Sequence, residues 1–236
     1  MMLRFAAKMT KRAVLIVLLA GIVLGFLLYW FFAPPAGERT LRKFDPDRLA
    51  GLELRMWQAY YAKQPVRLFS LLVTMLHEQY RYSWAVAVVE GFHLARAAAR
   101  FSNLHGNYDA LVLPDLESAY STAKSWLHAG FDPAAAARAE LAWWVARRIP
   151  GEDSPENVGN LMAQAYALLY EAPPESMRRA ALLRAQAGKL RDNQAAQPDW
   201  VAIEELLKQS YRELHGELAT AVAPTESVGF PAKLHN

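Results

Sequence analysis

The chain has 236 residues, of which 53% are hydrophobic and 21% charged, so its composition is that of a folded protein and excludes a disordered segment. It contains no cysteine, which excludes disulfide frameworks, Cys-ligated zinc, iron–sulfur clusters and thiol catalysis. The formal net charge is +3, but seven of the 26 basic residues lie in the first 43 positions. Residues 44–236 carry a net charge of −3, so no nucleic-acid partner is expected.

An apolar run over residues 13–33 follows a basic tail over residues 1–12. The run reads AVLIVLLAGIVLGFLLYWFFA and contains no charged residue. At about 1.5 Å per helical residue, it is long enough to cross a hydrocarbon core of about 30 Å. Aromatic residues gather at its end, as they do at a membrane–water interface. The sequence therefore predicts one transmembrane helix, with the lipid bilayer as a partner.

A cleaved signal peptide is the alternative interpretation, because a basic start and an apolar core are also its first two parts. Its third part, a cleavage site of small residues, does not fit. The apolar run ends in bulky aromatic residues, and Pro34 and Pro35 follow where the cut would fall. We therefore favour an uncleaved, single-pass anchor.

The orientation of this anchor rests on the basic residues that flank it. Four precede the run and four follow it closely, so the two sides are nearly balanced: Arg4, Lys8, Lys11 and Arg12, then Arg39, Arg42, Lys43 and Arg48. The short tail without acidic residues favours an N-terminus inside the cell. We therefore expect a bacterial inner-membrane protein with a periplasmic C-terminal domain, and a cytoplasmic domain is the alternative.

Two glycines in the run, Gly21 and Gly25, have the G-x-x-x-G spacing that lets two membrane helices approach closely. Glycine is frequent in membrane helices, so the spacing also arises by chance. If it is functional, the helix pairs with a second copy or with another membrane protein.

A juxtamembrane linker over residues 34–44 leads into an all-helical soluble domain over residues 45–222. Apolar residues recur with a helical period, and prolines preceded by Asp or Ser mark helix starts. No alternating strand pattern occurs. The predicted helices cover residues 46–63, 65–79, 84–103, 113–129, 133–148, 155–171, 174–192 and 199–221. The predicted fold class is thus all-α. The helices form a multi-helix bundle or, alternatively, a short α-solenoid of helical hairpins. A flexible tail follows over residues 223–236.

The strongest candidate for metal chemistry is the E-x-x-H motif formed by Glu90 and His93, which places two ligands on one face of a helix. A carboxylate-bridged metal site in a bundle also needs carboxylates from other helices, which Glu53 and Glu140 could supply. It needs a second E-x-x-H as well, and the sequence has none. We therefore expect neither a metal nor a cofactor, with these four residues as weak candidates.

Catalytic motifs are missing too: no serine stands in a G-x-S-x-G elbow, and no Walker or dinucleotide-binding glycine loop occurs. Aromatic clusters remain, and most of them are expected in the core. Trp143 and Trp144 are adjacent, so they cannot both point into one core, and we interpret one of them as a possible partner surface.

Three segments, LRMWQAYYAKQPVRLFSLL, ARAELAWWVARR and PDWVAIEELLKQSYREL, resemble an uncharacterised family of bacterial, membrane-anchored, all-helical proteins that has no assigned activity. The resemblance implies no functional residues. The sequence thus favours a non-enzymatic interaction or structural protein, a subunit or scaffold of a membrane-associated assembly. The alternative is a helical-bundle enzyme or carrier with a carboxylate–His metal site or an apolar ligand cavity.

Overall fold

A computed structural model describes residues 11–220, and all structural statements below concern this part of the chain. Residues 1–10 of the predicted basic tail and the whole of the predicted flexible tail over residues 223–236 lie outside it. The described part is all-helical and contains no strand. Its helices are α1 (Lys11–Phe32), α2 (Pro46–Tyr61), α3 (Pro65–Tyr80), α4 (Trp84–Asn103), α5 (Tyr108–Leu111), α6 (Leu113–Leu127), α7 (Pro133–Ala146), α8 (Pro155–Tyr170), α9 (Pro174–Asn193) and α10 (Trp200–Thr220).

The helix starts follow the capping rules that the sequence suggested. Proline occupies the first position of α2, α3, α7, α8 and α9, where its missing N–H costs no hydrogen bond. The side chain of Asp45 accepts hydrogen bonds from two backbone amides at the start of α2, and Ser154 caps α8 in the same way. One short helix, α5, was not predicted. It follows a turn in which Gly106 and Asn107 both have positive φ.

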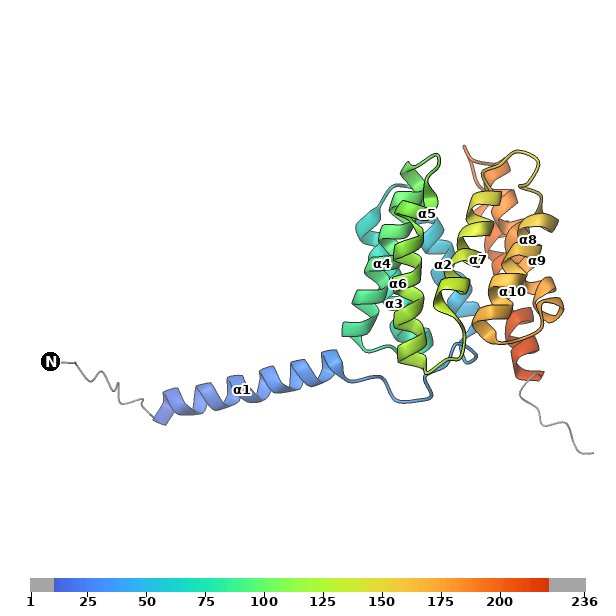
Figure 1. The fold of residues 1–236 in the computed structure, drawn as a ribbon. Coiled ribbons are helices and arrows are strands. Elements are labelled where there is room, and N and C mark those ends of the chain that lie inside the picture. The colour runs from blue at the N-terminus through green and yellow to red at the C-terminus, as the bar shows by residue number, and fades with distance from the viewer. Residues whose placement is uncertain (1–10, 221–236) are drawn as a thin grey trace, which may run out of the picture.

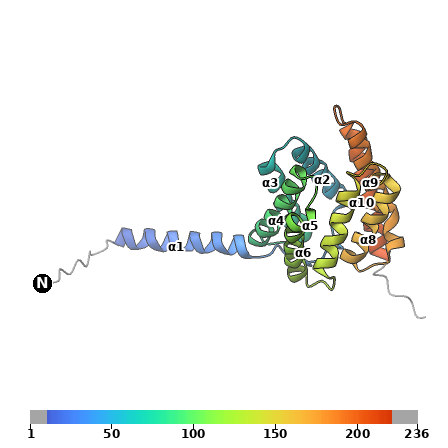
Figure 2. The ribbon, with the colours of Figure 1, turned by 45° about the horizontal axis from the view of Figure 1, so that its top comes forward.

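Eight of the described helices, α2 to α4 and α6 to α10, form a closed ring, and Figures 1 and 2 show how they are arranged. Along the chain, α2 packs on α3, α3 on α4, α4 on α6, and then each helix packs on the next one up to α10. The last helix, α10, packs back on α2 and closes the ring. An open solenoid would leave its first and last helices apart. The structure is therefore a bundle, and a ring-shaped one.

Small residues let neighbouring helices in one half of the ring approach closely. At Gly159 in α8, an added Cβ atom would lie 3.0 Å from the Cα atom of Leu182 in α9, so the two backbones nearly touch. Four buried alanines on α9 continue this close packing: Ala180, Ala181, Ala185 and Ala187. These small residues bring the backbones of α8 and α9 close together.

Helix α1 stands apart from the ring and is exposed along its length (Figure 1). Its stretch Arg12–Phe32 is long and apolar enough to cross a membrane, a criterion that a signal sequence would also meet. Trp30 contacts Trp84 at the start of α4, with ring centroids 5.6 Å apart. No described side chain comes within 4 Å of a Cβ placed on Gly21 or Gly25, so helix pairing through these glycines stays a prediction.

Candidate functional site

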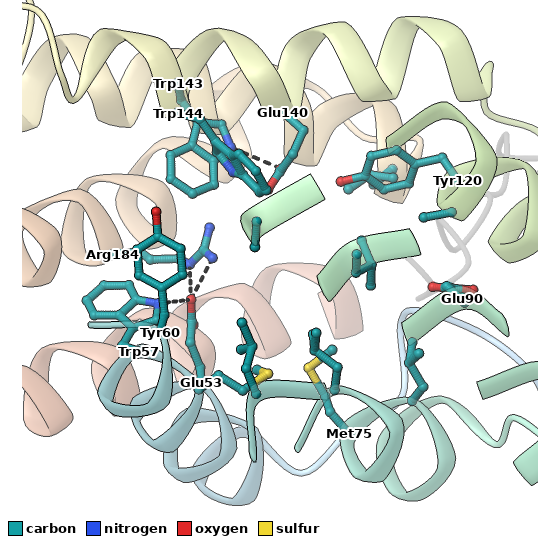
Figure 3. Close-up of a pocket in the computed structure, with 18 of the residues that line it drawn as sticks. Glu53, Trp57, Tyr60, Met75, Glu90, Tyr120, Glu140, Trp143, Trp144 and Arg184 are labelled. Carbon is teal, nitrogen blue, oxygen red and sulfur yellow. Dashed lines mark hydrogen bonds and ion pairs between the residues drawn. The ribbon is translucent and has the colours of Figure 1, made fainter. Parts of the chain in front are cut away.

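A cavity of about 520 Å³ lies in the middle of the ring. All eight helices of the ring, α2 to α4 and α6 to α10, contribute residues to its wall (Figure 3). This volume falls within the range of about 300–1,000 Å³ that is typical of small-molecule sites. The ring thus encloses a space large enough for an organic ligand.

Aromatic side chains form much of the cavity wall. Three tryptophans and several tyrosines reach it from six helices: Trp57, Tyr60, Tyr61, Tyr80, Tyr120, Trp143, Trp144, Tyr166, Tyr170 and Tyr211. Aromatic rings offer apolar area together with an electron-rich face, and tyrosine adds a hydroxyl group. The wall therefore suits a ligand with an apolar or aromatic body.

A buried ion pair crosses the inner side of the ring at Glu53 of α2. Arg184 of α9 donates from Nε and Nη2 to Oε1 of Glu53, at 2.8 and 2.5 Å. Tyr211 of α10 donates to Oε2 at 2.5 Å, and Trp57 donates to Oε1 at 3.1 Å. Burial opposes the charge of Arg184, but the Glu53 carboxylate outweighs it and holds the pKa of Arg184 well above its ordinary value. Both carboxylate oxygens of Glu53, a predicted metal-ligand candidate, thus accept hydrogen bonds that join α2 to α9 and α10.

Glu140 of α7 receives hydrogen bonds from both adjacent tryptophans. Trp143 donates to Oε2 at 3.0 Å, and Trp144 donates to Oε1 at 2.9 Å (Figure 3). Trp143 is buried and Trp144 is half-buried, and both line the cavity. A partner surface at Trp143 or Trp144 stays a prediction. Residues three and four positions after Glu140 flank its side chain, so both indole N–H groups reach the same carboxylate.

Glu90 of α4 is the least satisfied acid of the cavity wall. It is 5% exposed, and its Oε2 atom has no hydrogen-bond partner among the described residues. The hydroxyl group of Tyr82 is its buried neighbour on the cavity wall. Burial raises the pKa of Glu90 to about 8, and the neighbouring Tyr82 acts in the opposite direction. A buried polar atom without a partner is costly, so this position is suited to a ligand that supplies one.

His93, the other member of the E-x-x-H motif, faces α6 and not the cavity. Its Nδ1 atom lies 3.2 Å from Oδ1 of Asp115, a carboxylate that is 1% exposed. Arg96 and Arg100 bind the same carboxylate, so this cluster joins α4 to α6. Glu53, Glu90 and Glu140 line one cavity while His93 lies outside it. No group of three or more His, Asp or Glu residues within residues 11–220 is arranged to hold a metal ion.

Two further arginines lie where α7 ends, at one end of the cavity. Arg147 donates to the Tyr61 hydroxyl at 3.2 Å and to Asp192 at 2.8 Å. Arg148 donates to the carbonyl oxygens of Phe101 and Leu104, at 2.7 and 2.9 Å, where α4 ends. Carbonyl groups at a helix C-terminus attract cations, so Arg148 acts as a cap on α4.

Comparison of the chain with family models, with curated proteins and with solved structures gives no match. The resemblance to a bacterial membrane-anchored family stays a prediction.

The sequence interpretation missed Arg184, the partner of Glu53. A signal was present, because Arg184 stands on the same helical stripe as Met177, Ala181 and Gly188, all of which are buried. An arginine within an apolar stripe indicates a buried partner of opposite charge. The identity of that partner depends on how the helices pack, which the stripe does not reveal.

We expect Arg184→Met to destabilise the protein strongly, because it leaves the Glu53 carboxylate buried without its cation. Breaking a buried pair on one side costs about 3–5 kcal/mol. The matched control is Arg212→Met, which breaks the exposed Arg212–Asp47 pair between α10 and α2 and should cost far less, because water screens this pair. Thermal unfolding of the full-length protein in a nonionic detergent, followed by circular dichroism, measures both. Equal losses in the two variants would contradict a stabilising role of the buried pair.

The raised pKa of Glu90 predicts a pH-dependent penalty on folding. The unfolded carboxyl loses its proton near its ordinary pKa of 4.5, whereas the folded one keeps it up to about pH 8. Wild-type stability should therefore fall, relative to that of Glu90→Gln, as the pH rises from about 4.5 to 8, by up to about 1.4 kcal/mol per pH unit. Urea unfolding of both proteins at pH 5, 6.5 and 8 tests this. A constant difference between them would show that Glu90 ionises normally in the fold.

Proposed function

We propose that this protein is a membrane-anchored domain that binds a small organic molecule in the cavity at the centre of its helical ring. The observation that carries the proposal is that all eight ring helices contribute to the wall of one cavity of about 520 Å³. Binding and carriage need no catalytic group, and the proposal includes no reaction.

A ring with a purely structural role would fill its centre with side chains. Protein interiors are packed as densely as organic crystals, and empty space costs stability. Here a space stays open although large side chains make up most of the wall, and three alanines, Ala98, Ala119 and Ala123, face it. Large aromatic residues and unpaired polar atoms share the same wall. This mixture of an apolar body and a few polar groups is the composition of a ligand site.

The anchor in this proposal is α1, and the bilayer is its partner. The exposed apolar stretch Arg12–Phe32 supports an anchor, and the short linker between α1 and α2 keeps the ring near the membrane surface. From the acid-free tail before the helix we propose an inner-membrane location with the ring in the periplasm, and a cytoplasmic ring is the alternative. Protease digestion of intact spheroplasts distinguishes the two, because only a periplasmic ring is cut.

A second candidate function, as a subunit or scaffold of a membrane assembly, is favoured by the open face of α1. Gly21 and Gly25 lie one helical turn apart, and no described side chain covers either of them. Two such faces on neighbouring helices can approach closely in a bilayer. This function is compatible with ligand binding, because it uses α1 and not the ring.

For ligand binding, we expect a small molecule to copurify with the full-length protein extracted in a mild nonionic detergent. Ala98→Phe should abolish this, because the added ring projects into the cavity. Ala99→Phe, on the exposed face of the same helix, should leave it unchanged. Mass spectrometry of solvent extracts gives the readout, and circular dichroism checks the fold. An extract without a stoichiometric molecule, or one that is identical for the two variants, would contradict the proposal.

For helix pairing, replacing both Gly21 and Gly25 by Leu should abolish any anchor-dependent dimer, because the added side chains separate the helix backbones. Val23→Leu, on another face of α1, serves as the control. Chemical cross-linking in native membranes measures the dimer. A dimer that survives the double substitution would reject the role of the glycines.

A further inference from the structure

We infer that the ligand is an organic cation, an amine or quaternary ammonium group on an apolar body, held between Glu90 and Glu140. This inference rests on the proposed function and adds the chemical class of the ligand. The charged groups of the cavity wall differ in whether they have a partner of opposite charge.

Two of the four acidic residues that line the cavity are neutralised by arginines. Glu53 is bound by Arg184, and Asp192 by Arg147. These pairs also occupy the two arginines, so neither guanidinium is available to an anionic ligand. The third arginine of the wall, Arg148, donates to carbonyl groups at the end of α4. The cationic groups of the wall are thus all engaged within the protein.

The other two acidic residues, Glu90 and Glu140, have no cationic partner among the described residues. Glu140 receives the two indole N–H groups and interacts with the Tyr120 hydroxyl, all of which are neutral groups. Glu90 is 95% buried, and its Oε2 atom accepts no hydrogen bond. The cavity therefore presents two acidic groups that no positive charge of the protein balances. A buried carboxylate without a counter-charge is unfavourable, and a bound cation would remove this cost.

The two carboxyl groups act on the same part of the cavity. Tyr120 of α6 lies between them (Figure 3), and both contribute to its electrostatic environment. Burial raises the pKa of the Tyr120 phenol well above its ordinary value, and Glu140 and Glu90 raise it further. A positive group placed beside the Tyr120 ring would therefore feel the attraction of both carboxyl groups.

The aromatic wall also suits a cation. The face of an indole or phenol ring attracts ammonium and guanidinium groups, most strongly where water is excluded. The protein already uses this interaction, since the Arg184 guanidinium lies 5.0 Å from the centre of the Trp143 ring and that of Arg147 lies 5.7 Å from the Trp57 ring. A bare metal ion fits less well, because the described residues offer no group of three ligands. Carboxyl groups within an aromatic wall select an organic cation instead.

The test uses benzyltrimethylammonium, whose charge does not depend on pH, and its uncharged carbon isostere neopentylbenzene. Each is titrated into the full-length protein in a nonionic detergent at pH 8.5, and binding is measured by calorimetry. We expect the cation to bind more tightly than its isostere. Glu90→Gln and Glu140→Gln should each weaken cation binding by about tenfold or more and leave isostere binding unchanged. Glu117→Gln, on the outer face of α6, is the control and should change neither.

The outcomes separate this inference from the proposed function. Equal or tighter binding of neopentylbenzene, or cation binding that survives both Gln substitutions, would overturn the inference while leaving a ligand-binding cavity. Binding of neither compound would count against both proposals. Mass spectrometry of the native extract adds a second readout. A free amine or a lipid with an ammonium headgroup would support the inference, and a molecule without a cationic group would contradict it.

Discussion

The ring depends on the buried carboxylate of Glu53. It lies where α2, α9 and α10 meet, and it joins the first helix of the ring to the last two through Arg184 and Tyr211. A buried ion pair contributes little net stability, because both charges lose their hydration. Either charge buried without the other would be strongly destabilising. Separating the pair would leave each charge buried alone, so the pair opposes any separation of α2 from α9. Its position on the inner face also brings a polar group into a wall that is otherwise largely aromatic.

Closure of the ring has a geometric consequence for the centre. Eight helices that pack side by side in a circle cannot all touch across it, so the centre must be filled by long side chains or left open. Small residues at the contacts between helices, such as Gly159, draw the backbones together, while tyrosines and tryptophans project inward. Alanines among them, such as Ala119, leave the remaining space. The cavity is thus a product of how residue sizes are distributed around each helix.

The secondary structure was predictable because its causes are local. Capping residues such as Asp45 and Ser154 and prolines at helix starts act within a few positions, and these helix starts were predicted correctly. The closed ring was not predictable, because it depends on contacts such as that between Glu53 and Tyr211, 158 positions apart. The site was predictable in part. Glu53, Glu90 and Glu140 do line one space, whereas His93 binds Asp115 on another helix. The premise that Trp143 and Trp144 cannot both face one core assumed a solid core, whereas both residues line the cavity.

The contact between α2 and α10 determines when the ring can close during folding. While the chain is synthesised from its N-terminus, α1 and the first helices emerge long before α10. Glu53 therefore cannot contact Tyr211 until α10 has been made. Loop-closure entropy opposes such a distant contact, and folding of this kind is slow. The unfinished ring therefore exposes its aromatic inner face near the apolar helix α1. A chaperone that shields this face during synthesis would act on an arc of helices, because the ring closes only when α10 packs on α2.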